Sequence, residues 1–467
     1  MGAVSEAALT WWPPGEVVAL LGTLAVVLSL PRWLPDIVVA LRMRIFARIN
    51  GDEGIAVPGR LVDTAHFKRV YSDPAANGRS RGAALSDLFW YWLAPGPEIH
   101  QEHLEPGERY DEVARTTRRI LAMPTAELER LAARHVAAAL PADAPRGARL
   151  VRLRDLMMPI WAGFCYEIVF AAPCPPAARD LIVANADDVV TALKCCGLRH
   201  MDRRLRLTQY LVEHLDEVPH ALPAGLTTRE RAFYLQGTFF NTAVVQQSEA
   251  MTHLLMALAK HPDIQALLAA DPDDTRSLDH VIDETMRVYP LFGIAHRVTS
   301  AEIVVDDQVT LPAGSVLCFN YPQFHRAGYD DPERFDPARW ERLSVKEANH
   351  IPFGVAANRP CPAWHLSPIA MRVAAREVLR RFALYSSAGH TRSIPNRGPC
   401  LLVPRGRPAP RWLGAALAGI RTRDRWEDVW RSMVQLVLGS YMVWDARRKR
   451  LCRRYFEDRG DRVAAPR

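Results

Sequence analysis

The chain has 467 residues, of which 49% are hydrophobic, 24% are charged and 8% are aromatic. This composition is that of a globular protein and excludes a disordered, collagen-like or multi-span membrane protein. The formal net charge is +7, from 59 basic and 52 acidic residues. The segment after Arg407 holds 14 basic and 7 acidic residues, which leaves 45 of each sign in residues 1–407. A surplus confined to one tail argues against a body that binds nucleic acid.

The first 50 residues are distinct in composition. Residues 17–30 form an uncharged run of 14 residues, which is shorter than the roughly 20 residues that cross a bilayer. Residues 36–50 place arginines among apolar side chains, a pattern typical of helices that lie in a membrane interface. Pro31 and Pro35 separate the two stretches. We expect residues 1–49 to form a separate helical segment, either a membrane anchor or a pair of helices packed on the body.

Helical periodicity dominates the body of the chain, and strand-like alternation comes only near its end. Apolar spacing near 3.6 residues predicts helices at 111–121, 125–140, 177–192, 229–260, 279–288 and 367–382. Alternation predicts strands at 302–305, 309–317 and 399–403. We therefore predict a mainly α fold with a small β region, as one domain over residues 50–407. Residues 408–467 are basic and rich in Trp, and we expect them to be an appended helical extension.

One cysteine lies in an unusual setting. Cys361 belongs to the stretch PFGVAANRPCPA, residues 352–363, directly before a predicted helix. Amides at the start of a helix and the nearby Arg359 favour a thiolate, so we expect a lowered pKa for this thiol. A thiolate is what a metal ion would need as a ligand, although a lone cysteine is more often a small buried hydrophobic residue. The eight cysteines of the chain are too sparse for a disulfide scaffold and include no C-x-x-C pair, which indicates a reduced, cytoplasmic protein.

Two upstream features strengthen the metal-ligand interpretation of Cys361. Glu284 and Arg287 are three residues apart in a predicted helix and therefore share one face. Arg339 follows in the stretch FDPARW, between the predicted strands and the cysteine loop. Its guanidinium can complete a buried triad with Glu284 and Arg287 that holds the loop in place.

The order and spacing of these features resemble the cytochrome P450 family over about residues 50–407. The resemblance implies a single haem domain in which the thiolate of Cys361 ligates the iron of haem b. It also implies that Glu284 and Arg287 are the family's E-x-x-R pair and that Arg339 is its meander arginine. The arginines that it implies as haem-binding residues are Arg297, Arg359, Arg115 and Arg119.

The chain departs from the family pattern in two places. The cysteine loop has one residue more between Phe353 and Cys361, and alanines stand where glycines are usual. On the helix that would face the iron, the family's acid and alcohol pair falls on Val245 and Gln246, which are neither. Thr242 lies four residues before Gln246 on the same helix face. Gln246 with Thr242 either replaces the usual proton relay or has no catalytic part.

The resemblance implies a haem-thiolate monooxygenase that inserts one oxygen atom of O2 into an apolar small molecule, in secondary metabolism. Electrons would come from a separate ferredoxin and ferredoxin reductase, because no flavin or iron–sulfur domain is visible in the remaining length. Two alternatives stay open. One is a P450-like enzyme that uses peroxide or catalyses desaturation, coupling or rearrangement. The other is a non-catalytic haem-binding or sensor protein.

Overall fold

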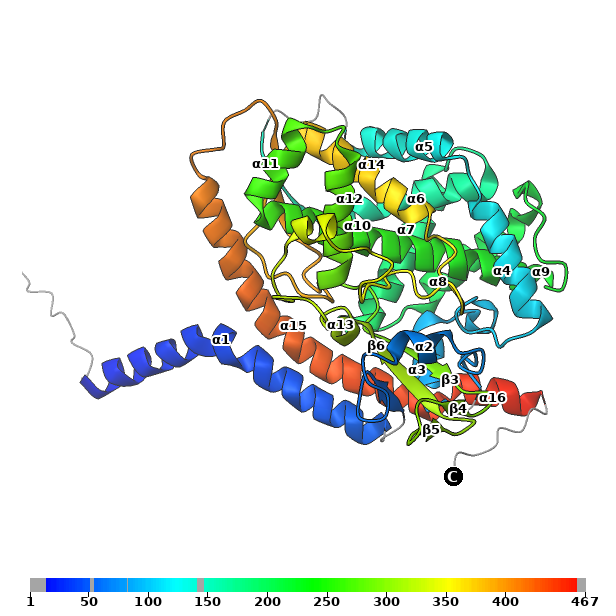
Figure 1. Cartoon of the computed structure of the whole chain (residues 1–467). Coiled ribbons are helices and arrows are strands. Elements are labelled where there is room, and N and C mark those ends of the chain that lie inside the picture. The colour runs from blue at the N-terminus through cyan, green and yellow to red at the C-terminus, as the bar shows by residue number, and fades with distance from the viewer. Residues whose placement is uncertain (1–13, 51–53, 82, 141–146, 460–467) are drawn as a thin grey trace, which may run out of the picture.

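The computed structural model describes residues 14–50, 54–81, 83–140 and 147–459 (Figure 1). Helices make up most of the body, and small sheets lie at its edges. The predicted mainly α fold with a small β region is confirmed.

A bundle of helices forms the larger core of the body. Its α-helices are α4 (Glu108–Leu121), α5 (Thr125–Ala139), α6 (Leu153–Phe170), α7 (Pro176–Leu193), α8 (Met201–Glu213), α9 (Thr228–Leu235), α10 (Val244–Lys260), α11 (Pro262–Ala270), α12 (Thr275–Val288) and α14 (Leu366–Arg381). Short 3-10 turns, η1 (Pro97–Ile99) and η2 (Leu215–Glu217), lie between them.

The central element of this bundle is α10, which packs against α6, α12 and α14. Nearly all of its residues are buried, as expected for a helix that is surrounded by other helices. A π-helical segment, η3 (Gln236–Ala243), joins α9 to α10, so the helix predicted at 229–260 is continuous but locally widened. Such π-helical turns occur frequently at functional sites.

Three small sheets complete the body within the described residues. The first has the order β1 (Ile55–Val57), β6 (Val316–Asn320) and β3 (Ile294–Val298), with β1 parallel and β3 antiparallel to β6. The others are β2 (Arg149–Arg152), β8 (Pro399–Pro404) and β7 (Phe382–Tyr385), and the pair β4 (Ile303–Val304) and β5 (Thr310–Leu311). The strand predicted at 309–317 is divided into β5 and the start of β6, because the chain turns at Gly314, whose φ is +83°. A second, smaller core forms around the first sheet and α2 (Phe67–Ser72).

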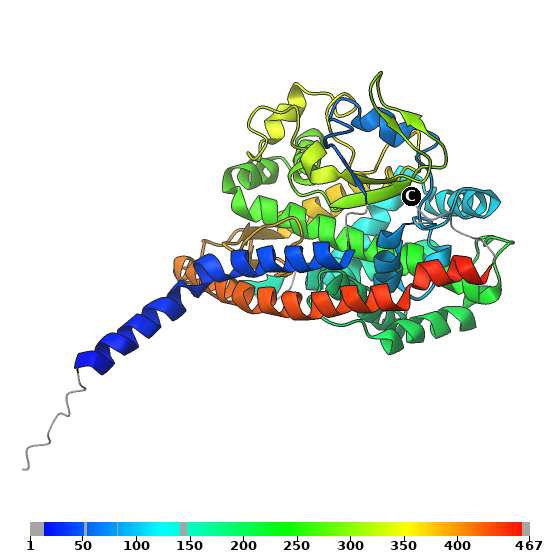
Figure 2. The same cartoon turned by 90° about the horizontal axis from the view of Figure 1, so that it is seen from below.

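Two long helices lie side by side along one side of the body, α1 (Pro14–Asn50) and α15 (Leu413–Lys449) (Figures 1 and 2). The expected break of the N-terminal segment into two helices is wrong, since α1 runs through both Pro31 and Pro35. Residues 16–28 of α1 are all exposed and project beyond the body, whereas its second half packs on α15 (Figure 2). A pair of helices packed on the body therefore describes only part of this segment. After α15, α16 (Leu451–Asp458) packs on α3 (Ala84–Leu93).

Candidate functional site

The loop that carries Cys361 is closed by its own backbone hydrogen bonds. The amide of Cys361 donates to the carbonyl oxygen of Phe353 at 2.9 Å, and Val355 and Asn358 form an isolated β-bridge between them. The additional residue is accommodated inside this closed loop. Positive φ angles fall on Gly354 (75°) and Arg359 (50°). None of the alanines of the loop needs a positive φ, and the strain is placed on Arg359 instead.

Cys361 is a partly buried residue whose thiol is desolvated, and the backbone N–H of Ala363 donates to the sulfur. Burial raises the pKa of Cys361 to about 12, although the amide of Ala363 acts in the opposite direction. The expected lowering of this pKa is therefore wrong for the chain without a metal ion, because α14 begins only at Leu366 and desolvation outweighs the amide. A metal cation bound to the sulfur would reverse the effect and deprotonate the thiol.

Three arginines from separate parts of the chain gather beside the cysteine loop. Arg297, on β3, donates to the hydroxyl of Tyr71 at 3.0 Å. Arg359, in the loop, donates to the carbonyl oxygen of Leu104 at 2.8 Å. Arg79 is buried and forms a 2.5 Å ion pair with Glu102. The sequence predicted the first two of these arginines at one site, and the structure adds the third.

This cluster of Arg79, Arg297, Arg359 and Glu102 carries more positive than negative charge. Burial acts to raise the pKa of Glu102, but the neighbouring Arg79 and Arg297 hold it below its ordinary value. One carboxylate against three guanidinium groups leaves two positive charges uncompensated within the cluster. Nη2 of Arg359 and Nε of Arg297 are buried without a hydrogen-bond partner in the described part of the chain. These atoms are available to an anionic ligand.

Asn358 joins the cysteine loop to the segment around α2. Its amide nitrogen donates to the carbonyl oxygens of Tyr71 (3.0 Å) and Ala76 (2.9 Å), and its amide oxygen accepts a long hydrogen bond of 3.4 Å from Arg297. Sequence reasoning missed Asn358, although a buried polar residue next to Arg359 in a short loop is a signal that could have found it. It missed Arg79 and Glu102 because nothing in the sequence relates these residues to a loop more than 250 positions away.

The side chains of Glu284, Arg287 and Arg339 form one buried network. Arg287 makes a two-point contact with the carboxylate of Glu284, at 2.9 and 2.8 Å, and Arg339 donates to the same carboxylate at 3.1 Å. The indole N–H of Trp340, in the 3-10 turn η4 (Pro337–Glu341), also donates to the carboxylate of Glu284, at 3.1 Å. Each oxygen of this carboxylate thus meets at least two donors, which is what a buried charge requires.

A second set of contacts connects this network to the start of the cysteine loop. Arg287 donates to the carbonyl oxygen of His325, directly after α13 (Tyr321–Phe324). Nε2 of His325 in turn accepts a hydrogen bond from the amide of Ile351 at 3.0 Å. Nε2 of His350 lies 3.3 Å from Oδ1 of Asp283 on α12. The network therefore holds the residues that precede the loop against α12.

The two candidate residues on the central helix have different surroundings. The hydroxyl of Thr242, in the π-helical segment, lies 2.6 Å from Nε2 of His100. Burial lowers the pKa of His100, so the ring is neutral at pH 7. Gln246 is partly buried, and no hydrogen bond of its side chain is found within the described residues. Its neighbour Gln247 exchanges hydrogen bonds with Ser367 at the start of α14, at 2.6 and 3.3 Å. The structure thus joins Thr242 to His100 and not to Gln246.

Arg115 and Arg119 lie on the exposed face of α4. Neither forms a hydrogen bond or ion pair with the arginine cluster in the described part of the chain, whereas Arg359 stacks on Tyr110 of the same helix with a guanidinium-to-ring distance of 4.0 Å. Their predicted contact with a cofactor stays a prediction.

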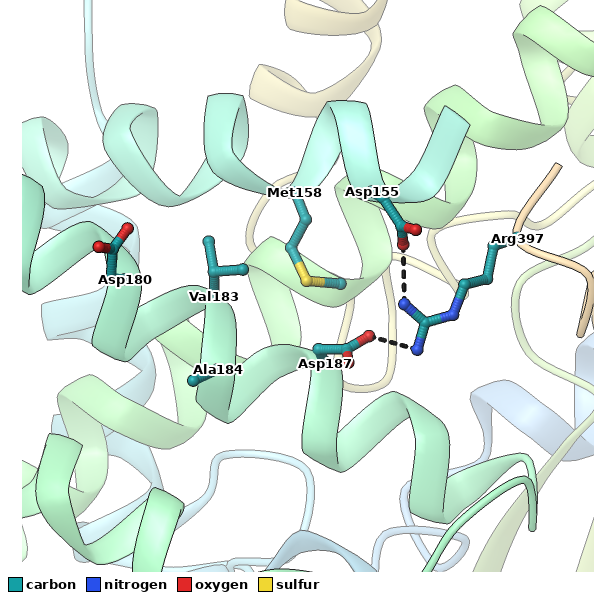
Figure 3. Close-up of a pocket in the computed structure, with 7 residues that line it drawn as sticks. All are labelled: Asp155, Met158, Asp180, Val183, Ala184, Asp187 and Arg397. Carbon is teal, nitrogen blue, oxygen red and sulfur yellow. Dashed lines mark hydrogen bonds and ion pairs between the residues drawn. The ribbon is translucent and has the colours of Figure 1, made fainter. Parts of the chain in front are cut away.

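A surface pocket between α6 and α7 contains no residue predicted for the site (Figure 3). Arg397 bridges Asp155 and Asp187 there, at 2.8 Å each. The positive charge is balanced by two carboxylates, so the arrangement joins the two helices to the turn before β8 and carries no free reactive group. The remaining lining residues are Met158, Asp180, Val183 and Ala184.

Comparison with known proteins finds similarity to one family. The model of the cytochrome P450 family matches residues 201–408, which include α10, the Glu284 network and the cysteine loop. A putative cytochrome P450 135B1 of Mycobacterium bovis is 32% identical over 166 residues, covering 33% of this chain and 35% of the relative. The cyclooctat-9-en-7-ol 5-monooxygenase of Streptomyces melanosporofaciens is 29% identical over 26% of this chain and 30% of the relative. The chain thus aligns with about a third of the length of these relatives.

Solved structures share the fold over a larger part of the chain. A six-coordinated cytochrome P450 from Thermus thermophilus has a TM-score of 0.57 with 19% identity, and covers 72% of this chain and 90% of its own. A zebrafish cytochrome P450 with abiraterone has a TM-score of 0.59 with 18% identity, and covers 72% of this chain and 89% of its own. The family match over residues 201–408 supports the resemblance to the cytochrome P450 family, and the solved structures show that the chain has the fold of these proteins.

Proposed function

We propose that this chain is a haem-thiolate monooxygenase that oxidises an apolar small molecule. The observation that carries the proposal is the position of a cysteine beside a cluster with two uncompensated positive charges. Haem b offers an iron that takes a thiolate ligand and two propionates with one negative charge each. The two propionates would neutralise the cluster.

The residues present fit this cofactor. Cys361 would ligate the iron, and its sulfur already accepts a backbone hydrogen bond that would tune it. Arg79, Arg297 and Arg359 would hold the propionates, with the buried unpartnered atoms of the last two as donors. When bound, the cofactor supplies the chemistry of O2: one oxygen atom enters the substrate and the other leaves as water, with two electrons and two protons supplied from outside.

The other residues orient the substrate and deliver protons. The apolar side chains around the π-helical segment, among them Phe239, Phe240 and Val244, are buried and would exclude water from the reaction. The pair formed by Thr242 and His100 can relay a proton near this segment, because the hydroxyl and the neutral imidazole can each donate and accept a hydrogen bond. Gln246 is the alternative relay residue.

The proposal extends to the metabolic role of the protein, its electron donors and its location. We propose a role in secondary metabolism, supported by the similarity to a relative whose name specifies a monooxygenase of a cyclooctatenol. Electrons would come from a ferredoxin and its reductase. We also propose that the protein is cytoplasmic and contacts a membrane through α1, whose residues 16–49 are long and apolar enough to cross one, with a mean hydropathy of 1.9 in the most apolar window.

Haem stoichiometry and turnover test the proposal. The purified full chain is expected to carry about one haem and to convert an apolar substrate with O2 and an electron donor. Cys361→Ala should lose thiolate-type haem binding, whereas Cys174→Ala, another partly exposed cysteine outside the site, should retain it. Unchanged haem binding in Cys361→Ala would overturn the assignment.

A second candidate function uses peroxide in place of O2 and electrons. It is favoured by the absence of an acid and alcohol pair at Val245 and Gln246, since direct use of peroxide needs less proton delivery to dioxygen. Product formed with peroxide, at a rate that electron donors and O2 do not reach, would favour this candidate over the first.

A further inference from the structure

The outer face of α15 carries a row of exposed apolar and aromatic side chains, which we call the aromatic stripe. Its members are exposed to between 37% and 72%: Trp426, Trp430, Met433, Val437, Tyr441 and Trp444. Their spacing of three or four residues places them on one face of the helix, along about 27 Å at 1.5 Å per residue. Single exposed apolar residues are common on protein surfaces, but an aligned row of this length requires an explanation.

The body covers only the opposite face of α15. Met442, Val443 and Ala446 are buried there, and the hydroxyl of Tyr91 on α3 donates to Asp445 at 2.9 Å. Gly439 lies against Cys195. The aromatic stripe therefore points away from the body, and no described segment of the chain covers it.

The second half of α1 packs on the body-covered face of α15, opposite the aromatic stripe. It is fastened to α15 by a 2.6 Å hydrogen bond from Arg42 to Gln435 and by the contact of Phe46 with Gly439. On its outer side Trp33, Ile37 and Leu41 are exposed to between 41% and 56%, again four residues apart. In both views the two helices lie side by side at one side of the molecule (Figures 1 and 2). The exposed side of α1 leads into the projecting residues 16–28, and it lies on a different side of the helix pair from the aromatic stripe.

The charges at the ends of the stripe indicate what covers it. Arg423 and Arg448 lie on the stripe side of α15, and each guanidinium side chain stays 63% exposed while it pairs with a carboxylate of its own helix. The guanidinium of Arg448 also lies 5.3 Å from the ring of Trp444. The segment after Arg407 has a surplus of seven positive charges. Tryptophan, tyrosine and arginine on one helix face are the side chains that favour the layer between lipid headgroups and acyl chains.

We propose that α15 is a membrane-docking helix whose aromatic stripe lies in the headgroup region of an anionic lipid bilayer, beside the point where α1 enters it. The inference rests on the proposed membrane contact of α1 and extends it, because α1 alone would attach the body without fixing its orientation. A second contact through α15 would fix which side of the body faces the lipid.

Quenching of tryptophan emission by lipid-borne bromine tests the contact directly. The full chain is mixed with phosphatidylcholine and phosphatidylglycerol vesicles whose acyl chains carry bromine just below the headgroups, and vesicle flotation is measured in parallel. We expect quenching in the wild type and loss of at least half of the quenched emission when Trp426, Trp430 and Trp444 are replaced together by Phe. Replacement of Trp364 by Phe serves as the control, because Trp364 is an exposed tryptophan outside the aromatic stripe.

A second pair of variants tests the docking without removing a fluorophore. Val437→Glu places a charge in the stripe and should reduce quenching several-fold, whereas Leu267→Glu, at an exposed leucine of α11, should not. A chain that floats with the vesicles while its triple Phe variant is quenched as strongly as the wild type would overturn the docking of α15 and leave the anchor intact. A chain that does not float would overturn both. Equal quenching by vesicles of phosphatidylcholine alone would overturn the requirement for anionic lipid.

Discussion

On the cysteine side of the candidate site, the buried carboxylate of Glu284 meets charged partners. Arg287 lies three residues further along α12, and Arg339 and Trp340 of η4 lie 55 and 56 residues away. In the π-helical segment η3, the partners of the polar side chains are neutral and distant in sequence. Thr242 meets His100, and Gln236 donates to the side chain of Asn185 at 3.0 Å. The two sides therefore differ in the charge and in the sequence distance of the partners that their polar side chains meet.

The difference follows from the energetic cost of burial. An unpaired buried charge costs several kcal/mol, so a buried carboxylate restricts its neighbours to a few residue types at short range. Neutral groups cost less and can find a partner in any segment that tertiary packing brings near. The pair of Glu284 and Arg287 can therefore be recognised as a sequence motif, whereas the partners of the η3 side chains become apparent only in the folded chain.

The largest effect is expected where the charge network is broken. Glu284→Ala leaves two buried arginines without their carboxylate and should destabilise the protein by about 3–5 kcal/mol. Urea unfolding followed by circular dichroism measures this loss. Glu302→Ala, at an exposed carboxylate, should change the free energy of unfolding by less than about 0.5 kcal/mol. Equal urea concentrations at the unfolding midpoints of the two variants would mean that the network does not stabilise the cysteine side.

The arginine cluster should control haem affinity. Arg79→Gln and Arg297→Gln each remove one charge-assisted contact to a propionate, worth about 1.5–3 kcal/mol, so affinity should fall about 10- to 100-fold. The transfer of haem to an excess of a haem-scavenging protein measures the change. Arg118→Gln, at an exposed arginine of α4 with no predicted cofactor contact, should bind haem as the wild type does. Haem affinity that falls with the α4 variant and not with the cluster variants would place the propionate contacts on α4.

The buried histidines should make stability fall at acid pH. Burial lowers the pKa of His253 to about 3 and that of His390 to about 2, while an unfolded histidine titrates near 6.5. The unfolded chain therefore binds more protons below pH 6.5. The stabilisation is fully present above that pH and is lost by about 1.4 kcal/mol per histidine for each pH unit below it.

Urea unfolding of the protein at pH 7.5, 6.5 and 5.5 measures this dependence. His253→Gln should reduce the slope below pH 6.5 by about one proton, whereas His200→Gln, at an exposed histidine, should keep it. A slope that His253→Gln leaves unchanged would show that this ring is protonated in the folded protein.

The smallest effects are expected on the side of the central helix. Thr242→Ala should lower the product formed per O2 consumed by several-fold, because His100 loses the hydroxyl it contacts, and Thr242→Ser should restore most of the yield. Gln246→Ala should change the yield less than twofold. Peroxide release is measured together with product. If Gln246→Ala releases more peroxide than Thr242→Ala does, the relay runs through Gln246.

Much of the fold could be predicted from sequence periodicity. The helix expected at 125–140 is α5 at Thr125–Ala139, and the strand expected at 399–403 is β8 at Pro399–Pro404. The helix α6 could not be recognised in the same way, because nearly all of its residues are buried and it contains Pro159, so no polar face marks its period. For α1, two prolines suggested a break that the structure does not have.

The site was predictable where charge and covalent spacing determine it. Glu284, Arg287 and Arg339 could be related by charge and spacing, whereas Arg297 and Arg359 were implied by the resemblance to the cytochrome P450 family; the structure brings these residues to two clusters. Arg79, Glu102 and His100 could not, because their approach depends on how the segment before α4 folds over the loop. The pKa of Cys361 also could not be predicted, since it depends on burial that the sequence does not show.

The most direct test of the account is the absorption spectrum of the reduced, carbon monoxide-bound protein. If Cys361 ligates the iron as a thiolate, the wild type should give the red-shifted Soret band of thiolate ligation, and Cys361→His should move it to the position of imidazole ligation. An imidazole-type spectrum in the wild type, or a thiolate-type band that persists in Cys361→His, would contradict the account.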